Sequence, residues 1–237
     1  MTEKHLSSQF DSELNTVSSR VMELGGMVEA QIHQAVYALQ EFDAEAAERV
    51  AETEHRVNAM EIEIDRELSS IIARRQPTAR DLRLLMAISR VTANLERVGD
   101  EAERVAIMVQ SIVRKGSAVR TLPASELRVA SELASSQLRK SLDAFARLDC
   151  DSAVAILKED DALDQEFDGF VRKLITYMME DPRTISSSLD LLFIAKAFER
   201  IGDHAKNIAE SIIYVVKGAD VRHTTMEEIE STVQARA

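Results

Sequence analysis

The chain has 237 residues, of which 45% are apolar and 30% charged, so it can bury a sizeable core and is unlike a disordered protein. Aromatic residues make up only 4%, and seven glycines with three prolines leave few interruptions, which favours long helices over strands. The net charge of −12 argues against a nucleic-acid-binding protein, which needs a basic surface.

The sequence also bears on where the protein works. Cys150 is the single cysteine, so no internal disulfide forms, which fits a reducing compartment. The N-terminal residues lack the apolar stretch of a signal peptide, and no run approaches the roughly 18 apolar residues of a membrane span. We therefore expect a cytoplasmic, soluble protein with no segment inserted in a membrane.

Apolar residues recur at three- and four-residue steps through the first half and predict three long helices. The first covers about residues 10–42, where Gly25 and Gly26 interrupt the pattern and could kink the helix. The second starts after Asp43, a suitable N-cap, and stops before Pro77. The third follows Thr78 and ends near residue 113, before a Lys-Gly stop at 115–116.

Residues 115–124 form the best candidate linker, and after it the plan repeats. A fourth helix is predicted to end near residue 148, a fifth to run from about 151 to Pro182, and a sixth from about 186 to 217. The sequence thus predicts an all-α protein of two homologous antiparallel three-helix bundles, in residues 1–116 and 117–218. The tail, residues 219–237, is left open between a short helix and a flexible segment.

One short phrase occurs once in each half, inside the third and the sixth helix. Residues 95–100 read Leu-Glu-Arg-Val-Gly-Asp and residues 198–203 read Phe-Glu-Arg-Ile-Gly-Asp, 103 positions apart (199 minus 96). A glycine inside a helix costs about 1 kcal/mol relative to alanine. Gly99 and Gly202 therefore require a reason, and we expect each to let a neighbouring helix approach closely.

The two phrases place acidic side chains one helical turn apart on one face. In the first copy these are Glu96 and Asp100, and in the second Glu199 and Asp203, with Asn207 near the edge of that face. On a helical wheel the acids lie opposite the apolar stripe of their own helix. We therefore expect an acidic strip on the outside of each bundle.

The preceding helix in each half adds carboxylates at the same spacing: Glu61 with Asp65, and Asp164 with Asp168. Both pairs border an apolar stripe, so they could lean toward the acidic strip of the next helix. Several converging oxygens are what a hard divalent cation, or a mixed-ligand iron or zinc cluster, requires. A solvated acidic surface is the alternative, and the repetition is the argument for a metal site.

The sequence holds little that indicates catalysis. A Glu-x-x-His occurs once, at residues 52–55, whereas carboxylate-bridged di-iron bundles need it twice. His204 is expected at the surface, because it points away from the acidic face. We find no Ser-His-Asp arrangement and no glycine-rich phosphate loop, so we do not expect an enzyme. A di-metal enzyme or a metal-storing bundle is the alternative, and both need the carboxylates inside a bundle.

The duplicated Glu-Arg-(Val/Ile)-Gly-Asp phrase resembles that of the PhoU family, together with Arg-Gln-Pro-Thr at residues 75–78 and Tyr-Met-Met-Glu-Asp-Pro-Arg at 177–183. The resemblance covers the chain to about residue 218. It implies two three-helix bundles in a cytoplasmic, usually dimeric negative regulator of the phosphate-starvation response. It also implies two partners, the ATPase subunit of the phosphate ABC transporter and a phosphate-sensing histidine kinase, and a role in modulating phosphate uptake.

The resemblance further implies metal clusters held by the repeated motif, here by Glu96 and Asp100 and by Glu199 and Asp203. The family motif often continues four residues later with Asn or Glu. Asn207 fits in the second half, but Arg104 takes that place in the first. A cation there disfavours metal, so the first site is expected to be the weaker one.

Overall fold

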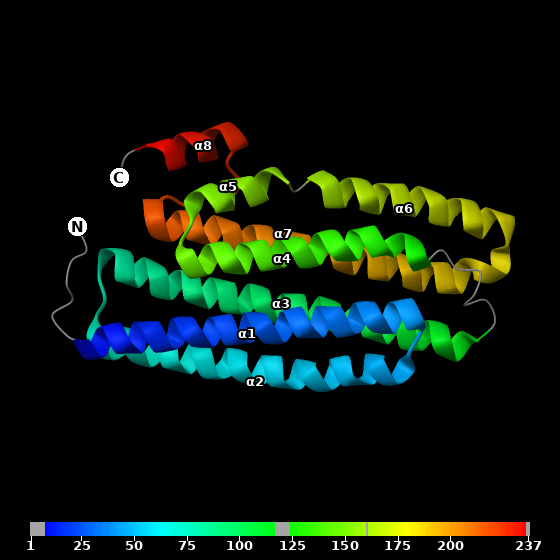
Figure 1. Ribbon diagram of the computed structural model, residues 1–237, viewed down its shortest axis with the longest axis horizontal. Coiled ribbons are helices and arrows are strands. Elements are labelled where there is room, and N and C mark those ends of the chain that lie inside the picture. Colours follow the sequence, from blue (N-terminus) through cyan, green and yellow to red (C-terminus); the bar gives the residue numbers. More distant parts are fainter. Residues whose placement is uncertain (1–7, 117–123, 160, 236–237) are drawn as a thin grey trace.

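The computed structural model describes residues 8–116, 124–159 and 161–235, and the regular elements in these ranges are all helices (Figure 1). The first half contains α1 (Ser8–Glu41), α2 (Ala44–Arg75) and α3 (Ala79–Lys115). The second contains α4 (Leu127–Arg147), α5 (Cys150–Lys158), α6 (Asp161–Glu180) and α7 (Ile185–Lys217), with short 3₁₀ turns η2 (Ala124–Glu126) and η3 (Pro182–Thr184). The all-α fold of two three-helix bundles is confirmed.

The helix boundaries of the first half follow the local signals in the sequence. Asp43 caps α2 by accepting hydrogen bonds from the backbone N–H groups of Glu45 and Ala46. Gly116 ends α3 with a φ of +66°, a conformation that L side chains rarely adopt. α1 runs through Gly25 without interruption, and a Cβ on Gly25 would come within 2.8 Å of Leu142 on α4. Gly25 therefore allows α1 and α4 to approach each other closely.

The single fifth helix predicted for the second half is wrong, because the chain forms α5 and α6 in its place. Residues 159–161 are three consecutive acids, which disfavour the C-terminus of one helix and favour the N-terminus of the next. The Nε2 of Gln137 also donates to the backbone carbonyl of Glu159, 3.4 Å away. This carbonyl also accepts from the backbone N–H of Ala162, so the side chain from α4 adds a second hydrogen bond at the break.

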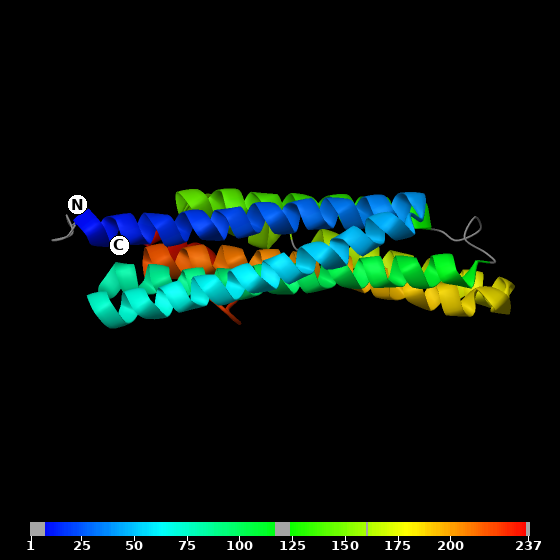
Figure 2. The same ribbon diagram turned by 90° about the horizontal axis from the view of Figure 1, so that it is seen from below.

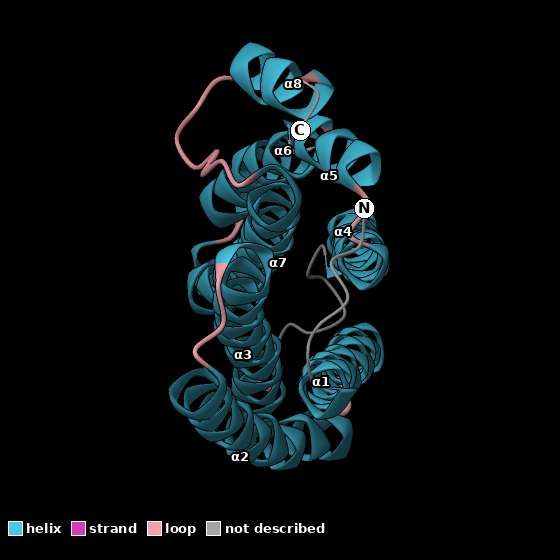
Figure 3. Cartoon of the chain, turned by 90° about the vertical axis from the view of Figure 1, so that its left-hand side faces the viewer, coloured by secondary structure: helices cyan, strands magenta, loops and turns pink. Residues whose placement is uncertain are grey.

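The helices form two layers around one continuous core (Figures 2 and 3). α2, α3, α7 and α6 follow one another in a curved layer, and α1 and α4 lie on its inner side. α3 and α7 run antiparallel at the centre of this layer and make the most extensive contact in the molecule. This central pair packs the two halves together, and its apolar stripes are fully buried at residues that include Val98, Val105, Ile201 and Ile208.

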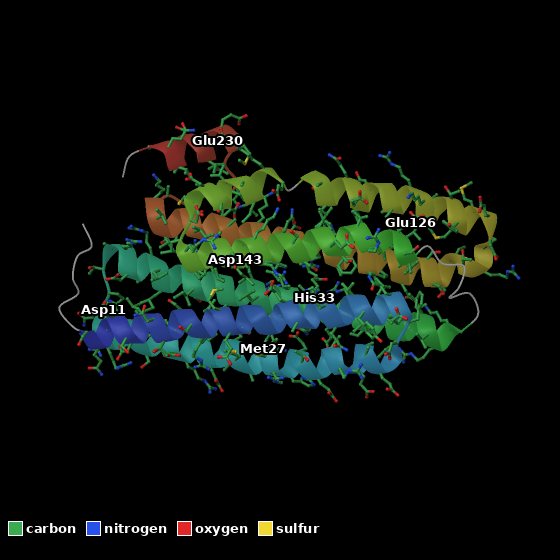
Figure 4. The ribbon with its side chains drawn as sticks, viewed as in Figure 1. Asp11, Met27, His33, Glu126, Asp143 and Glu230 are labelled. Carbon is green, nitrogen blue, oxygen red and sulfur yellow. The ribbon has the colours of Figure 1, made fainter. Side chains whose placement is uncertain are left out.

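The chain beyond α7 forms a short helix, α8 (Met226–Gln234), so the described part of the tail is ordered. Thr225 and Glu228 make a reciprocal capping box at its start. Ile229 is buried, and Glu230, marked in Figure 4, pairs with Lys158 at the end of α5. Among the described residues, no helix is both long and apolar enough to cross a membrane.

Candidate functional site

The acids of the first motif meet the acids of the preceding helix. Burial raises the pKa of Glu96 on α3, and the carboxylates of Asp100 and Glu61 raise it further. Burial also raises the pKa of Glu61 on α2, followed by the charges of Asp65 and Asp100. These four residues, which we call the α2–α3 acid cluster, therefore bring four carboxylates from two helices into one electrostatic neighbourhood.

The donors of this cluster suit a hard cation, since all are carboxylate oxygens. A cation would also relieve the mutual repulsion that raises the pKa of Glu61 and Glu96. As the side chains stand, no three His, Cys, Asp or Glu groups in the described part of the chain are close enough to hold a metal ion. Binding therefore requires rotamer changes, which the exposed Asp65 and Asp100 can make.

A buried carboxyl group, missed by the sequence reasoning, lies beneath this cluster. The side chain of Glu54 on α2 is only 2% exposed, and its Oε2 accepts a hydrogen bond from Nε2 of Gln31 on α1 at 2.8 Å. Its Oε1 has no hydrogen-bond partner among the described residues. The sequence does indicate that Glu54 is buried, because it falls in line with Val50 and Val57 on the apolar stripe of α2.

The low-polarity surroundings of Glu54 favour its neutral form. The pKa of Glu54 is raised to about 7, mainly by burial, which Gln31 opposes and to which the charges of Asp100, Glu103 and Glu96 add. The motif glycine makes room for this group, since a Cβ on Gly99 would lie 2.5 Å from Oε2 of Glu54 and 3.1 Å from Oε1 of Gln31. The expected close approach at Gly99 is thus confirmed, and what approaches is a carboxyl group.

The second motif has different surroundings. Glu199 on α7 is 13% exposed, and its Oε1 accepts a hydrogen bond from Nζ of Lys196 at 2.5 Å. Asp203 and Asn207 are exposed on the same helix, and Asp164 and Asp168 are exposed on α6. Below the motif, a Cβ on Gly202 would lie 2.5 Å from Leu163 and 2.8 Å from Gln137. Here the glycine makes room for a leucine and an amide.

α3 and α7 join the two motifs through an ion pair whose carboxylate is buried. Glu101, which follows the first motif, is 3% exposed. Its Oε1 lies 3.1 Å from Nε of Arg200, and its Oε2 lies 3.3 Å from Nε of Arg104. Burial raises the pKa of Glu101, and both arginines oppose that rise. Arg200 belongs to the second motif, so this contact links the two copies directly.

His204 occupies the equivalent position in the second half (204 minus 103 is 101). The expectation of a surface histidine is wrong, because α3 covers this side of α7 and buries the ring. Its Nδ1 lies 3.0 Å from Oδ1 of Asn94, which also accepts from Asn207, so Nδ1 carries the proton. Burial, with smaller effects of the charges of Arg200 and Arg97, lowers the pKa of His204 to about 4. The ring is neutral at pH 7.

A cleft of about 620 Å³ lies where the chain beyond α7 crosses back over that helix. Its polar wall includes Arg200, Asp203 and Glu210, and its other walls include His223 and Met226. Burial raises the pKa of Glu210, while Lys206, Arg222 and His223 oppose that rise. The cleft therefore has charges of both signs and does not select one kind of ligand.

Comparison with known proteins decides the family. The PhoU domain family matches this chain twice, over residues 21–109 and 127–212. The chain belongs to the PhoU family. It is 49% identical over 229 residues to a "Phosphate-specific transport system accessory protein PhoU homolog" from Burkholderia sp, a match that covers 97% of each chain. It is 45% identical over 233 residues to the Escherichia coli K12 protein "Phosphate-specific transport system accessory protein PhoU", covering 98% of this chain and 95% of that one.

Solved PhoU structures have the same fold. The crystal structure of PhoU from Pseudomonas aeruginosa matches with a TM-score of 0.85 at 42% identity, over 89% of this chain and 100% of that one. PhoU from Streptococcus pneumoniae, described as a phosphate transport system regulatory protein, matches with a TM-score of 0.82 at 27% identity, over 90% of this chain and 99% of that one. The two PhoU domains correspond to the two bundles, so the sequence repeat and the structural repeat coincide.

Proposed function

We propose that this protein is a negative regulator of the phosphate-starvation response. In this proposal it is a cytoplasmic homodimer that links the ATPase subunit of the phosphate ABC transporter to the phosphate-sensing histidine kinase and modulates phosphate uptake. The supporting observation is the extent of the similarity, since a relative named as an accessory protein homolog of the phosphate-specific transport system matches over 97% of both chains. The similarity therefore runs through both bundles and includes both copies of the acidic motif.

The placement of the acids argues against the di-metal enzyme. Such an enzyme holds its metals inside a helix bundle, with open coordination positions. Here Asp65 and Asp100 are exposed, and the buried Glu54 has an amide, Gln31, as its hydrogen-bond partner. A regulatory scaffold requires neither an enclosed metal pair nor a substrate pocket beside it.

We further propose that the α2–α3 acid cluster binds a divalent cation, or anchors an iron or zinc cluster. Glu61 and Asp65 would contribute from α2, and Glu96 and Asp100 from α3. A bound cation would supply positive charge between two helices whose facing carboxylates repel each other. In this proposal the cation ties α2 to α3 and takes part in no chemical step.

The regulatory role is tested by deleting the gene and following a phosphate-starvation reporter in phosphate-rich medium. We expect the reporter to switch on, and the wild-type chain supplied in trans to switch it off again. A second arm supplies the double variant Glu61→Gln, Asp100→Asn, which removes two charges from the cluster and keeps the shape of both side chains. A reporter that stays off in the deletion strain would contradict the regulatory role, whatever the second arm shows.

A further inference from the structure

The central helix pair has one exposed face, and the internal repeat relates the two ends of that face. α3 is packed against α1, α2 and α7, while α7 is packed against α3, α4, α5 and α6. Each helix therefore has one exposed stripe, on the outer side of the curved layer (Figure 3). Because the helices run antiparallel, the end of α3 lies beside the start of α7, where Nζ of Lys115 lies 2.5 Å from Oδ2 of Asp190.

The chain beyond α7 covers one end of this face, which we call the covered end. Gly218 lies against the guanidinium group of Arg83, since a Cβ on Gly218 would be 3.4 Å from Cζ. Oδ2 of Asp220 lies 4.0 Å from an Nη of Arg90, and the neighbouring Val221 is buried. An acidic and an apolar side chain of one segment thus cover the start of α3.

The opposite end, which we call the open end, is the more apolar of the two: Ile185 and Leu189 correspond to the apolar Leu82 and Met86 of the covered end, and two further positions differ. Phe193 stands where Arg90 stands at the covered end (193 minus 103), and Ile107 stands where Glu210 does (210 minus 103). The apolar residues of the open end are Ile107, Ile185, Leu189 and Phe193. Each is between 42% and 50% exposed, and three of them follow one another at four-residue steps along α7. The three residues on α7 form an apolar stripe of helical spacing, and Ile107 belongs to the neighbouring α3.

Cations surround this stripe, and their carboxylate partners are covered. Arg104 and Lys196 are each 47% exposed, whereas their partners Glu101 and Glu199 are 3% and 13% exposed. Lys115 is likewise more exposed than its partner Asp190, and Arg114 is exposed beside it. In a chain with a net charge of −12, the open end therefore presents positive groups to solvent around an apolar stripe.

We propose that the open end is a docking surface for an amphipathic helix of a partner protein, with acidic residues flanking the apolar stripe of that helix. A helix fits because apolar side chains on two neighbouring antiparallel helices form an elongated apolar surface, which can contact residues i, i+4 and i+7 of a partner helix. Acidic residues on both sides of the partner's apolar stripe fit because the groups around the stripe of the open end are basic. The covered end shows the same pairing within the chain, where Asp220 lies beside Arg90 and the next residue, Val221, is buried.

A second copy of this chain is the poorer occupant of the open end. Two copies meeting there about a two-fold axis would place Arg104 and Lys196 opposite the same cations of the partner, and like charges across an interface are unfavourable. This inference goes beyond the proposed function. It involves neither the α2–α3 acid cluster nor its cation, so the docking surface and the proposed cation site can each be wrong independently.

Site-specific photocrosslinking in cells tests the docking surface. A benzophenone amino acid is placed at Leu189, and the matched control carries it at Met86, the equivalent position at the covered end; the native side chains are 42% and 41% exposed. We expect position 189, but not 86, to capture one helical segment with acidic flanks, identified by mass spectrometry. Equal yields at both positions, or capture of a second copy, of lipid or of a basic segment, would overturn the proposal.

Binding of the captured segment then tests the chemistry. The segment is synthesised with a fluorescent label, and its affinity for the purified full chain is measured by anisotropy. Leu189→Ser and Lys196→Glu are each expected to weaken binding roughly ten-fold, and Met86→Ser to leave it unchanged. Replacing one acid of the peptide by lysine should restore binding to Lys196→Glu. Equal weakening by Met86→Ser, or no effect of Lys196→Glu, would contradict the docking surface.

Discussion

The two halves of this chain carry the same motif in different surroundings. In the first half, the motif acids face acids of α2 and lie above a buried carboxyl group, Glu54. In the second half, the motif glutamate is paired with Lys196, and Leu163 fills the space below the motif glycine. The comparison shows that a repeated motif fixes the position of its own side chains, whereas the neighbouring helices decide what those side chains can do.

Replacing Glu54 by glutamine should give the largest change in stability. The change is specific to the first half, since no acidic side chain pairs with Gln137, the amide below the second motif, in the described second half. With a pKa of about 7 in the folded protein against 4.5 normally, Glu54 stabilises the fold fully below about pH 4.5. This contribution is lost as the pH rises through 7, at a total cost of about 3 kcal/mol. Urea unfolding at pH 5 and pH 8 should show Glu54→Gln more stable than the wild type at pH 8 only.

The same substitution also affects a buried oxygen that lacks a hydrogen-bond partner. In Glu54→Gln, the introduced amide would place an N–H group near Oε1 of Gln31, which has no partner among the described residues. Urea unfolding at pH 5 serves as the control, because Glu54 is largely protonated there in the folded state and the two side chains are then nearly equivalent. An unchanged difference between the two proteins at both pH values would show that Glu54 does not titrate as the structure requires.

Arg200 and Arg97 occupy equivalent positions and should differ in importance. Arg200→Ala leaves the buried Glu101 with Arg104 alone, which should cost about 2 kcal/mol. Arg200 and Arg104 are both well exposed, so the cost falls below that of a fully buried pair. Arg97→Ala removes an exposed charge that acts on the neutral His204 and offsets part of the repulsion at Glu61 and Glu96, and stability should change by no more than about 0.5 kcal/mol.

Arg97→Ala should also raise the pKa of His204 from its value of about 4, because Arg97 is one of the two arginines that lower it. NMR titration of the imidazole protons measures this change. Similar losses of stability in the Arg97 and Arg200 variants would mean that the contact between α3 and α7 is symmetric, contrary to the geometry.

Lys196→Gln should have the smallest effect on stability, at most about 1 kcal/mol, because the ion pair with Glu199 is partly exposed. Its effect on the cation affinity of the second motif should be larger. Without the lysine, Oε1 of Glu199 becomes available, so the second motif should gain affinity for a divalent cation. Calorimetric titration with Mn²⁺ measures this gain, and an unchanged affinity would mean that Lys196 does not explain the difference between the halves.

Much of the fold could be predicted from the sequence, because each helix of the first half carries its own periodicity, cap and stop. The break between α5 and α6 was missed, since apolar periodicity continues across the three acids at residues 159–161. His204 was misplaced because a helical wheel describes only one helix, and the burial of this ring comes from α3. Glu54 could have been found from its position between Val50 and Val57, but its amide partner lies 23 residues away on α1.

The sequence predicts the first motif to be the weaker metal site, and our proposal reverses that order because of neighbouring residues. Arg104 made the first motif look the weaker one, but its guanidinium pairs with Glu101 and leaves the α2–α3 acid cluster intact. Lys196, three residues before the second motif glutamate, was the overlooked residue. Spacing along one helix could not show which of these two cations reaches the motif acids.

The central claim is that the first motif, together with α2, holds the cation. Substoichiometric Mn²⁺ added to the isotopically labelled protein broadens the NMR signals nearest to the bound ion. Our account predicts that the amide signals around Glu61 and Asp100 broaden first, and that Glu61→Gln with Asp100→Asn abolishes this broadening. Broadening that begins around Glu199 and Asp203 would contradict it.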